Sequence, residues 1–247
     1  KNDEMITLAK FLAISGIILP MLPHKNLIPD INLTPYSIWL ATVVVSGISY
    51  LSYLLKRYVF HESGTLVSGI IGGLYSSTAT ISVLARKSRK ASEQEATDYV
   101  AAMLLAVSMM FLRFMILILI FSREIFLSIY PYLLTMAVVA AIVAWFIHSR
   151  QKRPEGQSAE TEEDDSSNPL EFKVALIFAI LFVIFTFLTH YTLVYAGTGG
   201  LNLLSFVSGF SDITPFILNL LQNTGSVAAL IITACSMQAI ISNIMVN

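Results

Sequence analysis

A run of small and hydroxyl-bearing residues lies within an apolar stretch in the segment GGLYSSTATISVLARKSRK, residues 72–90. A lipid-facing helix would carry leucine, isoleucine or valine at such positions. If the helix breaks here, hydroxyl groups and the free backbone N–H groups at the start of a half-helix favour an anion or a polar ligand. The segment is therefore a candidate binding site, and its candidate ligand-binding residues are Tyr75, Ser76, Ser77, Thr78 and Thr80.

A second stretch, SFVSGFSDITPFILNL at 205–220, aligns with residues 69–84 at a constant offset of 136. The alignment places Gly73 on Gly209 and Thr78 on Thr214. It also predicts a helix break before Pro215, because proline cannot donate a helical hydrogen bond. A separate sequence similarity aligns Ser108-Met109 with Ser236-Met237 at an offset of 128. The second stretch adds four candidate binding residues: Ser211, Asp212, Thr214 and Asn219.

Two ionisable residues stand within apolar segments, Arg113 and Asp212. Charged side chains in a membrane are costly and are functional hypotheses by default. Asp212 is expected to line a polar site and is the candidate metal ligand, with Arg113 as the counter-charge. An Arg113–Asp212 pair could also be purely structural, since buried ion pairs often are.

Small residues have a simpler explanation as well, because they let membrane helices approach closely. Packing is the favoured interpretation for Gly69, Gly72 and Gly73. A binding site is favoured for the pair formed by 76–78 and 211–214.

Composition places these residues in a membrane. The 247 residues are 55% hydrophobic and 13% charged, whereas soluble domains carry roughly 25% charged residues. The mean hydropathy is +0.73. We therefore expect an all-α, polytopic transmembrane helix bundle, with the third and seventh of about eight spans interrupted. The expected spans are about 5–22, 36–56, 65–85, 96–121, 130–149, 170–195, 201–221 and 225–246.

The alignment predicts two internal repeats of four spans, residues 1–123 and 130–247, joined across the 123–130 loop. The second contains an aqueous linker at 150–168 and a glycine-rich turn at 195–202. Duplicated halves with interrupted helices are a recurring transporter plan, with the binding site between the repeats near the midplane. Whether the interrupted spans cross the membrane or re-enter it stays open.

Charge and cysteine usage narrow the function. A net charge of −1 gives no support for nucleic-acid binding. The single cysteine, Cys235, provides no disulfide or metal framework. The sequence contains no HExxH and no CxxC, so an enzyme is not expected, and neither is a cofactor beyond a bound or coupling cation. Odd-numbered loops carry eight Lys and Arg against three in the even-numbered loops, which predicts that the odd loops are cytoplasmic.

The segments SGIIGGLYSSTATISVLARKSR, IWLATVVVSGISYLSYLLKR, NPLEF and SGFSDIT resemble a bacterial membrane domain of unknown function that is often fused behind an MgtC/SapB domain. The G-x-x-SSTAT core is the most specific part. The family commonly has D-x-D where this chain has SDIT, so only Asp212 carries over. The resemblance implies an inner-membrane transporter, and its link to magnesium comes from the fused neighbour. The residues it carries over are Gly72, Gly73, Ser76, Ser77, Thr78, Ala79, Thr80, Ala85, Arg86, Arg113 and Asp212.

The leading hypothesis is a transporter or permease for an inorganic ion or small solute in the bacterial inner membrane, with a cation slightly favoured. The alternative is a non-transporting membrane regulator that acts through its cytoplasmic loops. The expected partners are the lipid bilayer and the transported ion or solute, and the small-residue faces would also allow a homodimer.

Overall fold

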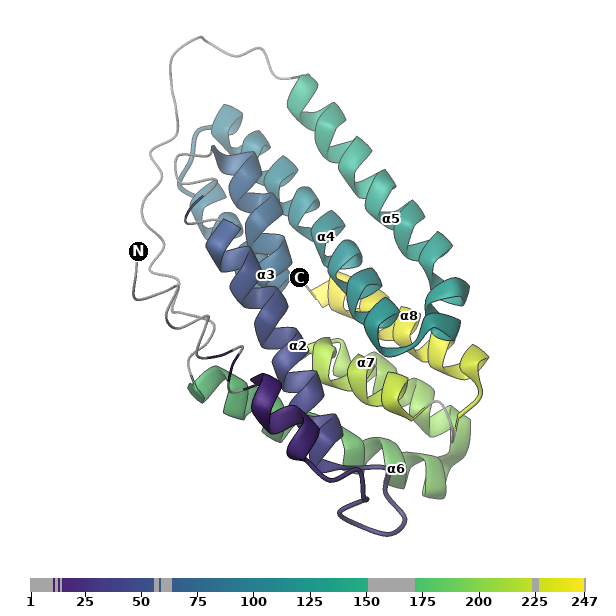
Figure 1. Cartoon of the computed structure of the whole chain (residues 1–247). Helices are drawn as coiled ribbons and strands as arrows, with labels where there is room; N and C mark the ends of the chain where they lie inside the picture. The colour runs from purple at the N-terminus through teal and green to yellow at the C-terminus, as the bar shows by residue number, and fades with distance from the viewer. Residues whose placement is uncertain are drawn as a thin grey trace. The chain divides into compact units, whose positions relative to one another are not determined.

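The computed structural model describes residues 15–55, 64–150, 172–223 and 227–246, together with residues 11, 13 and 58. Within these ranges most of the chain is helical (Figure 1). The predicted linker lies outside the described residues from position 151 onward, as do the first residues of the first predicted span. The helices are α2 (Pro35–Leu54), α3 (Thr65–Ser88), α4 (Glu93–Phe121), α5 (Arg123–Ser149), α6 (Phe172–Ser208), α7 (Ile213–Gln222) and α8 (Ala229–Val246).

The prediction of an all-α membrane bundle is confirmed. Six of these seven helices, all except the ten-residue α7, are long and apolar enough to cross a membrane. The seventh predicted span is divided in two, because α6 continues to Ser208 and α7 begins only at Ile213.

The predicted loop between 123 and 130 is wrong. Helix α4 ends at Phe121 and α5 begins at Arg123, so one residue, Ser122, joins them. The Ser122 hydroxyl accepts a hydrogen bond from the Ile125 amide at 3.4 Å, which caps the new helix. Pro131 lies inside α5.

The predicted glycine-rich turn at 195–202 is also wrong, because α6 runs through it. Gly197 alone leaves the helical conformation, with φ 58° and ψ −151°. A residue with a Cβ rarely adopts this backbone conformation, whereas glycine adopts it readily. The other glycines of this stretch remain helical, so the predicted turn is a kink at one position.

The chain folds into two compact units. One comprises residues 48–117 and 126–168, and so contains α3 with most of α4 and α5. The Ser108 hydroxyl of α4 donates to the Ala137 carbonyl of α5 at 2.8 Å. Nearer the end of α5, His148 Nδ1 lies 2.8 Å from Asp98 Oδ1 of α4. These contacts hold α4 and α5 together as a helical hairpin.

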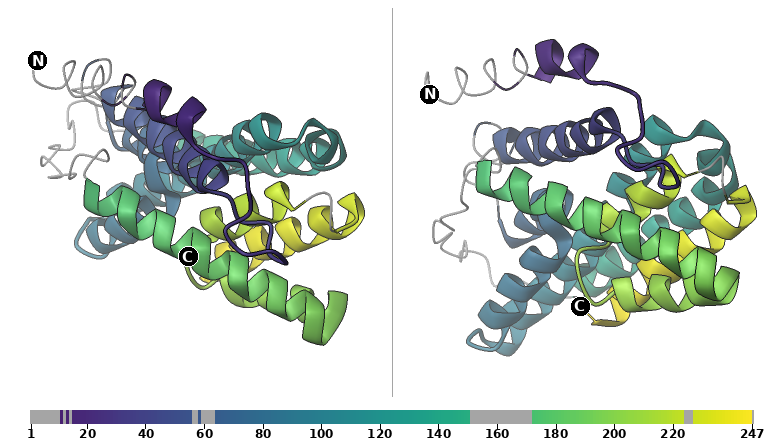
Figure 2. Two further views of the ribbon diagram at one scale, coloured as in Figure 1. Left: turned by 60° about the horizontal axis from the view of Figure 1, so that its bottom comes forward. Right: turned by 90° about the horizontal axis from the view of Figure 1, so that it is seen from below.

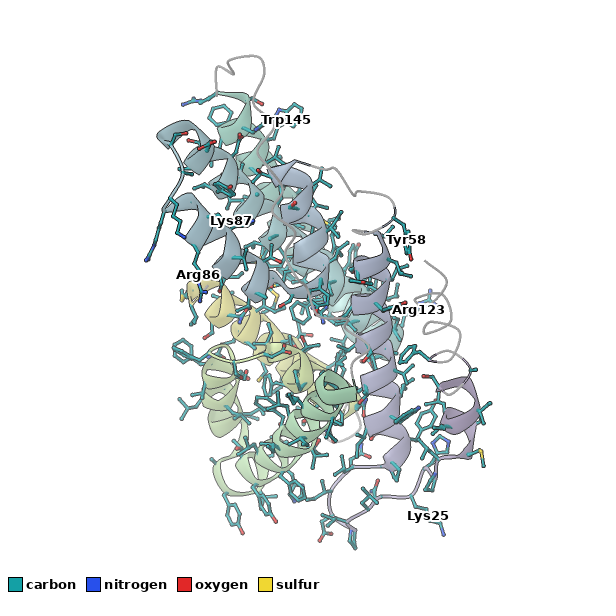
Figure 3. The ribbon with its side chains drawn as sticks, turned by 90° about the vertical axis from the view of Figure 1, so that its left-hand side faces the viewer. Lys25, Tyr58, Arg86, Lys87, Arg123 and Trp145 are labelled. Carbon is teal, nitrogen blue, oxygen red and sulfur yellow. The ribbon has the colours of Figure 1, made fainter. Side chains whose placement is uncertain are left out.

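The outward face of α5 is apolar. Trp145 is 73% exposed and Ile142 60%, and Figure 3 shows Trp145 on this helix. Only 22% of the most apolar window of α5 is buried. Large apolar side chains facing outward along a whole helix are expected where the surrounding solvent is lipid.

The other unit comprises residues 1–47, 118–125 and 169–246 and contains α6, α7 and α8. Figure 2 shows α6 running alongside α7 and α8, and contacts join all three helices. Every residue of α7 from Ile213 to Leu221 is buried. The Phe216 ring lies 5.6 Å from the Phe185 ring of α6, measured between centroids. Helix α7 is therefore the core of this unit.

Candidate functional site

The first predicted interruption is present in α3, at Ser76. This residue has φ −158° and ψ 105°, an extended conformation within a run of helix. Its hydroxyl accepts a hydrogen bond from the Ala79 amide at 3.4 Å. That is the bond a serine makes at the start of a helix, so α3 consists of two helical halves and Ser76 caps the second.

The glycines before this break serve close packing. A Cβ on Gly73 would lie 2.6 Å from the Ala106 backbone of α4, and a Cβ on Gly69 would collide with the Ala102 carbonyl. Both glycines therefore let α3 approach the backbone of α4. At Gly72 a Cβ would meet the Thr80 hydroxyl of the same helix at 2.5 Å. Gly72 thus leaves room for the Thr80 side chain, which follows the break at Ser76.

Arg113 reaches the break from α4. Its Nη1 donates to the Tyr75 carbonyl at 2.8 Å. The extended residue at 76 removes the regular helical pattern next to this carbonyl, and a buried carbonyl without a partner is costly. One N–H of the guanidinium therefore satisfies the backbone of the broken helix, and four further N–H donors belong to the same group.

The second interruption is present between α6 and α7, over residues 209–212. Asp212 is the N-cap of α7, and its Oδ1 accepts from the Thr214 amide at 2.9 Å. Pro215 does not cause the break. It lies in the first turn of α7, where its missing N–H would have had no helical partner.

Asn243 of α8 supports this second break. Its Nδ2 donates to the Gly209 carbonyl at 2.9 Å and to the Ser211 carbonyl at 3.4 Å. Gly209 is again a packing position, because a Cβ there would collide with the Ser242 side chain.

The same construction therefore occurs twice, with equivalent positions 136 residues apart. Gly73 corresponds to Gly209, Ser76 to Asp212, and Ala106 to Ser242. In each unit a glycine packs against a neighbouring helix, which is α4 for Gly73 and α8 for Gly209. An extended residue caps a half-helix, and a side chain of the same neighbouring helix donates to a carbonyl of the break. The packing contacts of the two units are related by the offset of 136 residues and not by the offset of 128.

The candidate residues separate into two groups. Around the first break, Ser77 is buried and Thr78 exposed, and Arg113 bonds to the backbone of Tyr75. Around the second, Asp212 and Ser211 are exposed, whereas Thr214 is buried. Arg113 and Asp212 each have a partner within their own unit.

Asn219 does not belong to the second break. It lies about two turns further along α7, is 1% exposed, and donates from Nδ2 to the Thr186 hydroxyl of α6 at 2.7 Å. Sequence reasoning missed Thr186 and Thr189, although their spacing in FTFLTHYT places both on one face of a helix.

The described part of the chain contains no group of three or more His, Cys, Asp or Glu side chains placed to hold a metal ion. A cation at Asp212 would therefore take its remaining ligands from hydroxyls, carbonyls or water. Such oxygen ligands suit Na⁺, K⁺, Mg²⁺ or Ca²⁺ better than zinc.

Comparison with known proteins places this chain in a family. Residues 43–247 match the domain of unknown function DUF4010, and the chain belongs to this family. A protein of Aquifex aeolicus (strain VF5), named "Uncharacterized protein", is 26% identical over 190 residues, which cover 74% of this chain and 80% of the relative. No solved structure matches the chain.

Proposed function

We propose that the protein is a transporter or permease for an inorganic ion or a small solute. The observation that supports this best is the doubled interruption, a half-helix start capped at Ser76 and again at Asp212, within segments apolar enough for a membrane. Unwound backbone at membrane depth is tolerated only where protein or a water-filled cavity satisfies it. Transporters use such half-helix starts to bind substrates and coupling ions.

The polar groups at the two breaks differ in charge, and this bears on the substrate. Asp212 supplies a carboxylate, one oxygen of which caps α7. Arg113 supplies a guanidinium beside Tyr75. We favour a cation that contacts Asp212, because a carboxylate is the stronger ligand for one. The alternative substrate is an anion that Arg113 and the half-helix N–H groups would bind.

Flux into proteoliposomes tests the proposal. Purified protein is reconstituted, and uptake of Na⁺, K⁺, Mg²⁺, Ca²⁺, chloride and phosphate is compared with that of empty vesicles. For a cation substrate we expect Asp212→Asn to reduce uptake by about tenfold or more, because the charge is lost. Asparagine still caps a helix well, so the fold should survive.

Glu124→Gln is the matched control, since it removes a carboxylate from the first turn of α5, a helix that carries neither break. Its uptake should equal that of the wild type. Anion uptake that is abolished by Arg113→Gln and unaffected by Asp212→Asn would reverse the assignment of substrate charge. The absence of flux for every solute would overturn the transport proposal in favour of a membrane regulator.

The membrane and orientation are part of the same proposal. Arg86 and Lys87 end α3 (Figure 3), and Arg150 follows α5. The Asp98–His148 contact brings the start of α4 beside the end of α5, so these basic residues lie at one end of their unit. Lys and Arg are enriched in cytoplasmic loops, and we assign this end to the cytoplasmic side of a bacterial inner membrane. Association with an MgtC/SapB domain stays a prediction.

A further inference from the structure

A polar cavity lies in the unit that contains α6 and α7, and its lining includes no residue of either helix break. Its volume is about 310 Å³. The segment before α2 forms one wall, and the end of α7 and the middle of α6 form the rest. Several of the side chains that line it are polar: Asn26, Asp30, Asn32, Thr189, His190 and Asn223.

Two of the amide side chains have a fixed orientation. Asn32 donates from Nδ2 to the Gln222 carbonyl at 3.1 Å, and Asn223 donates from Nδ2 to the Asn219 carbonyl at 2.8 Å. A carbonyl only accepts hydrogen bonds, so the nitrogen end of each amide must face it. The oxygen end of each amide is therefore the end that a ligand in the cavity can use.

Thr189 gives an independent indication of a ligand. Its side chain is 2% exposed, and its buried hydroxyl oxygen has no hydrogen-bond partner among the described residues. A threonine in a helix usually bonds to the carbonyl four residues before it. Thr186, one turn earlier, does so, donating to the Phe182 carbonyl at 2.8 Å. Thr189 does not, although it lines the cavity.

A buried hydroxyl oxygen without a partner is rare in proteins and needs an explanation such as a bound water or ion. The groups around the cavity supply a carboxylate at Asp30, amide oxygens at Asn32 and Asn223, and the hydroxyl of Thr189. His190 can accept a hydrogen bond from a water through its unprotonated ring nitrogen. Oxygen is thus the main donor atom, and the carboxylate gives the site one negative charge.

We propose that this cavity binds a hard cation that keeps part of its hydration shell, with Asp30 and Thr189 as protein ligands. Hard cations take carboxylate, amide, hydroxyl and water oxygens as ligands. A water molecule occupies about 30 Å³ in the liquid, so the cavity has room for an ion together with several waters. The site is separate from Asp212 and does not depend on transport.

The test is cation binding to the purified chain in detergent. The melting temperature is measured against increasing NaCl, KCl, MgCl₂ or CaCl₂, with choline chloride holding the ionic strength constant. We expect at least one of these cations to raise the melting temperature, because a ligand that binds only the folded state stabilises it. The half-saturating concentration then gives the apparent affinity.

Two variants remove ligand atoms without changing the size of the side chains much. Asp30→Asn removes the charge, and Thr189→Val removes the hydroxyl. Each should weaken the apparent affinity by about tenfold or more. Glu124→Gln, which removes a carboxylate that does not line the cavity, should keep the wild-type affinity.

The proposal is overturned if no cation shifts the melting temperature, or if Asp30→Asn and Thr189→Val respond as the wild type does. Its failure and that of the transport proposal are distinguishable. Cation binding without flux would contradict transport alone, and flux that depends on Asp212, without binding at Asp30, would contradict the cavity site alone.

Discussion

The breaks at Ser76 and at Asp212 share a framework but differ in where they place charge. In α3 the cap is a neutral hydroxyl, and the side chain that supports the break from the next helix is the cation Arg113. Between α6 and α7 the cap is the anion Asp212, and the supporting side chain is the neutral amide of Asn243. The packing glycine occupies the same position in both.

This difference distinguishes the features that stabilise a broken helix from the features that could determine which ligand it binds. A glycine, a cap and a donor to the freed carbonyl are what a broken helix needs in order to exist in a membrane. None of these needs requires a net charge. In the proposed transporter, the charges at Arg113 and Asp212 are the part of each break that would select a ligand, and the glycines are the part that allows close packing.

The largest expected effect comes from removing the shared glycine. Gly73→Val would drive a side chain into the Ala106 backbone, and Gly209→Val would drive one into the Ser242 side chain. Overpacking typically costs 1–3 kcal/mol, and a backbone collision should reach about 3 kcal/mol. Unfolding in mixed micelles measures the loss. Gly199→Ala is the control, because its Cβ would meet open space. Equal stability of Gly73→Val and wild type would contradict the packing role.

A smaller effect is expected from removing the supporting donor. Arg113→Met leaves the Tyr75 carbonyl without its bond from Nη1, and the free energy of unfolding should fall by about 1.5 kcal/mol. Asn243→Leu should do the same at Gly209. Arg113→Gln and Asn243→Gln each keep an N–H donor. If Arg113→Gln recovers less of the free energy of unfolding lost in Arg113→Met than Asn243→Gln recovers of that lost in Asn243→Leu, the two supports are not equivalent.

The smallest effects are expected at the caps, and here the two breaks should differ. Asp212→Ala should lower the free energy of unfolding by about 1 kcal/mol. Ser76→Ala should lower it by about half as much, because its bond to Ala79 is 3.4 Å long against 2.9 Å at Asp212. Asp212→Asn should stay near wild type. The same unfolding assay checks the order, and a larger loss for Ser76→Ala would contradict it.

The sequence predicted both breaks to within a few residues, because hydroxyl, glycine and aspartate residues stand out in an apolar helix. It could not identify Ser76 among its neighbours, since Ser77, Thr78 and Thr80 can all cap a helix. It also attributed the second break to Pro215, where the cap at Asp212 is the cause. The donors Arg113 and Asn243 act on distant carbonyls, which only the packing of α4 and α8 determines.

The errors have a common physical origin. Proline and glycine are strong local signals for a chain break, but neighbouring helices can overrule them. Pro131 lies more than two turns after the first residue of α5, and the helix continues through it. Around Gly197 the chain remains helical on both sides, and one residue with positive φ takes up the whole change in direction.

The single-residue joint at Ser122 has a consequence for how the protein is made. Helices α4 and α5 have no aqueous loop between them, and the Ser108–Ala137 bond ties them together along their length. We expect such a pair to enter a bilayer as one hairpin with Ser122 and Arg123 at its turn, so that α4 reaches its final depth only after α5 has been made.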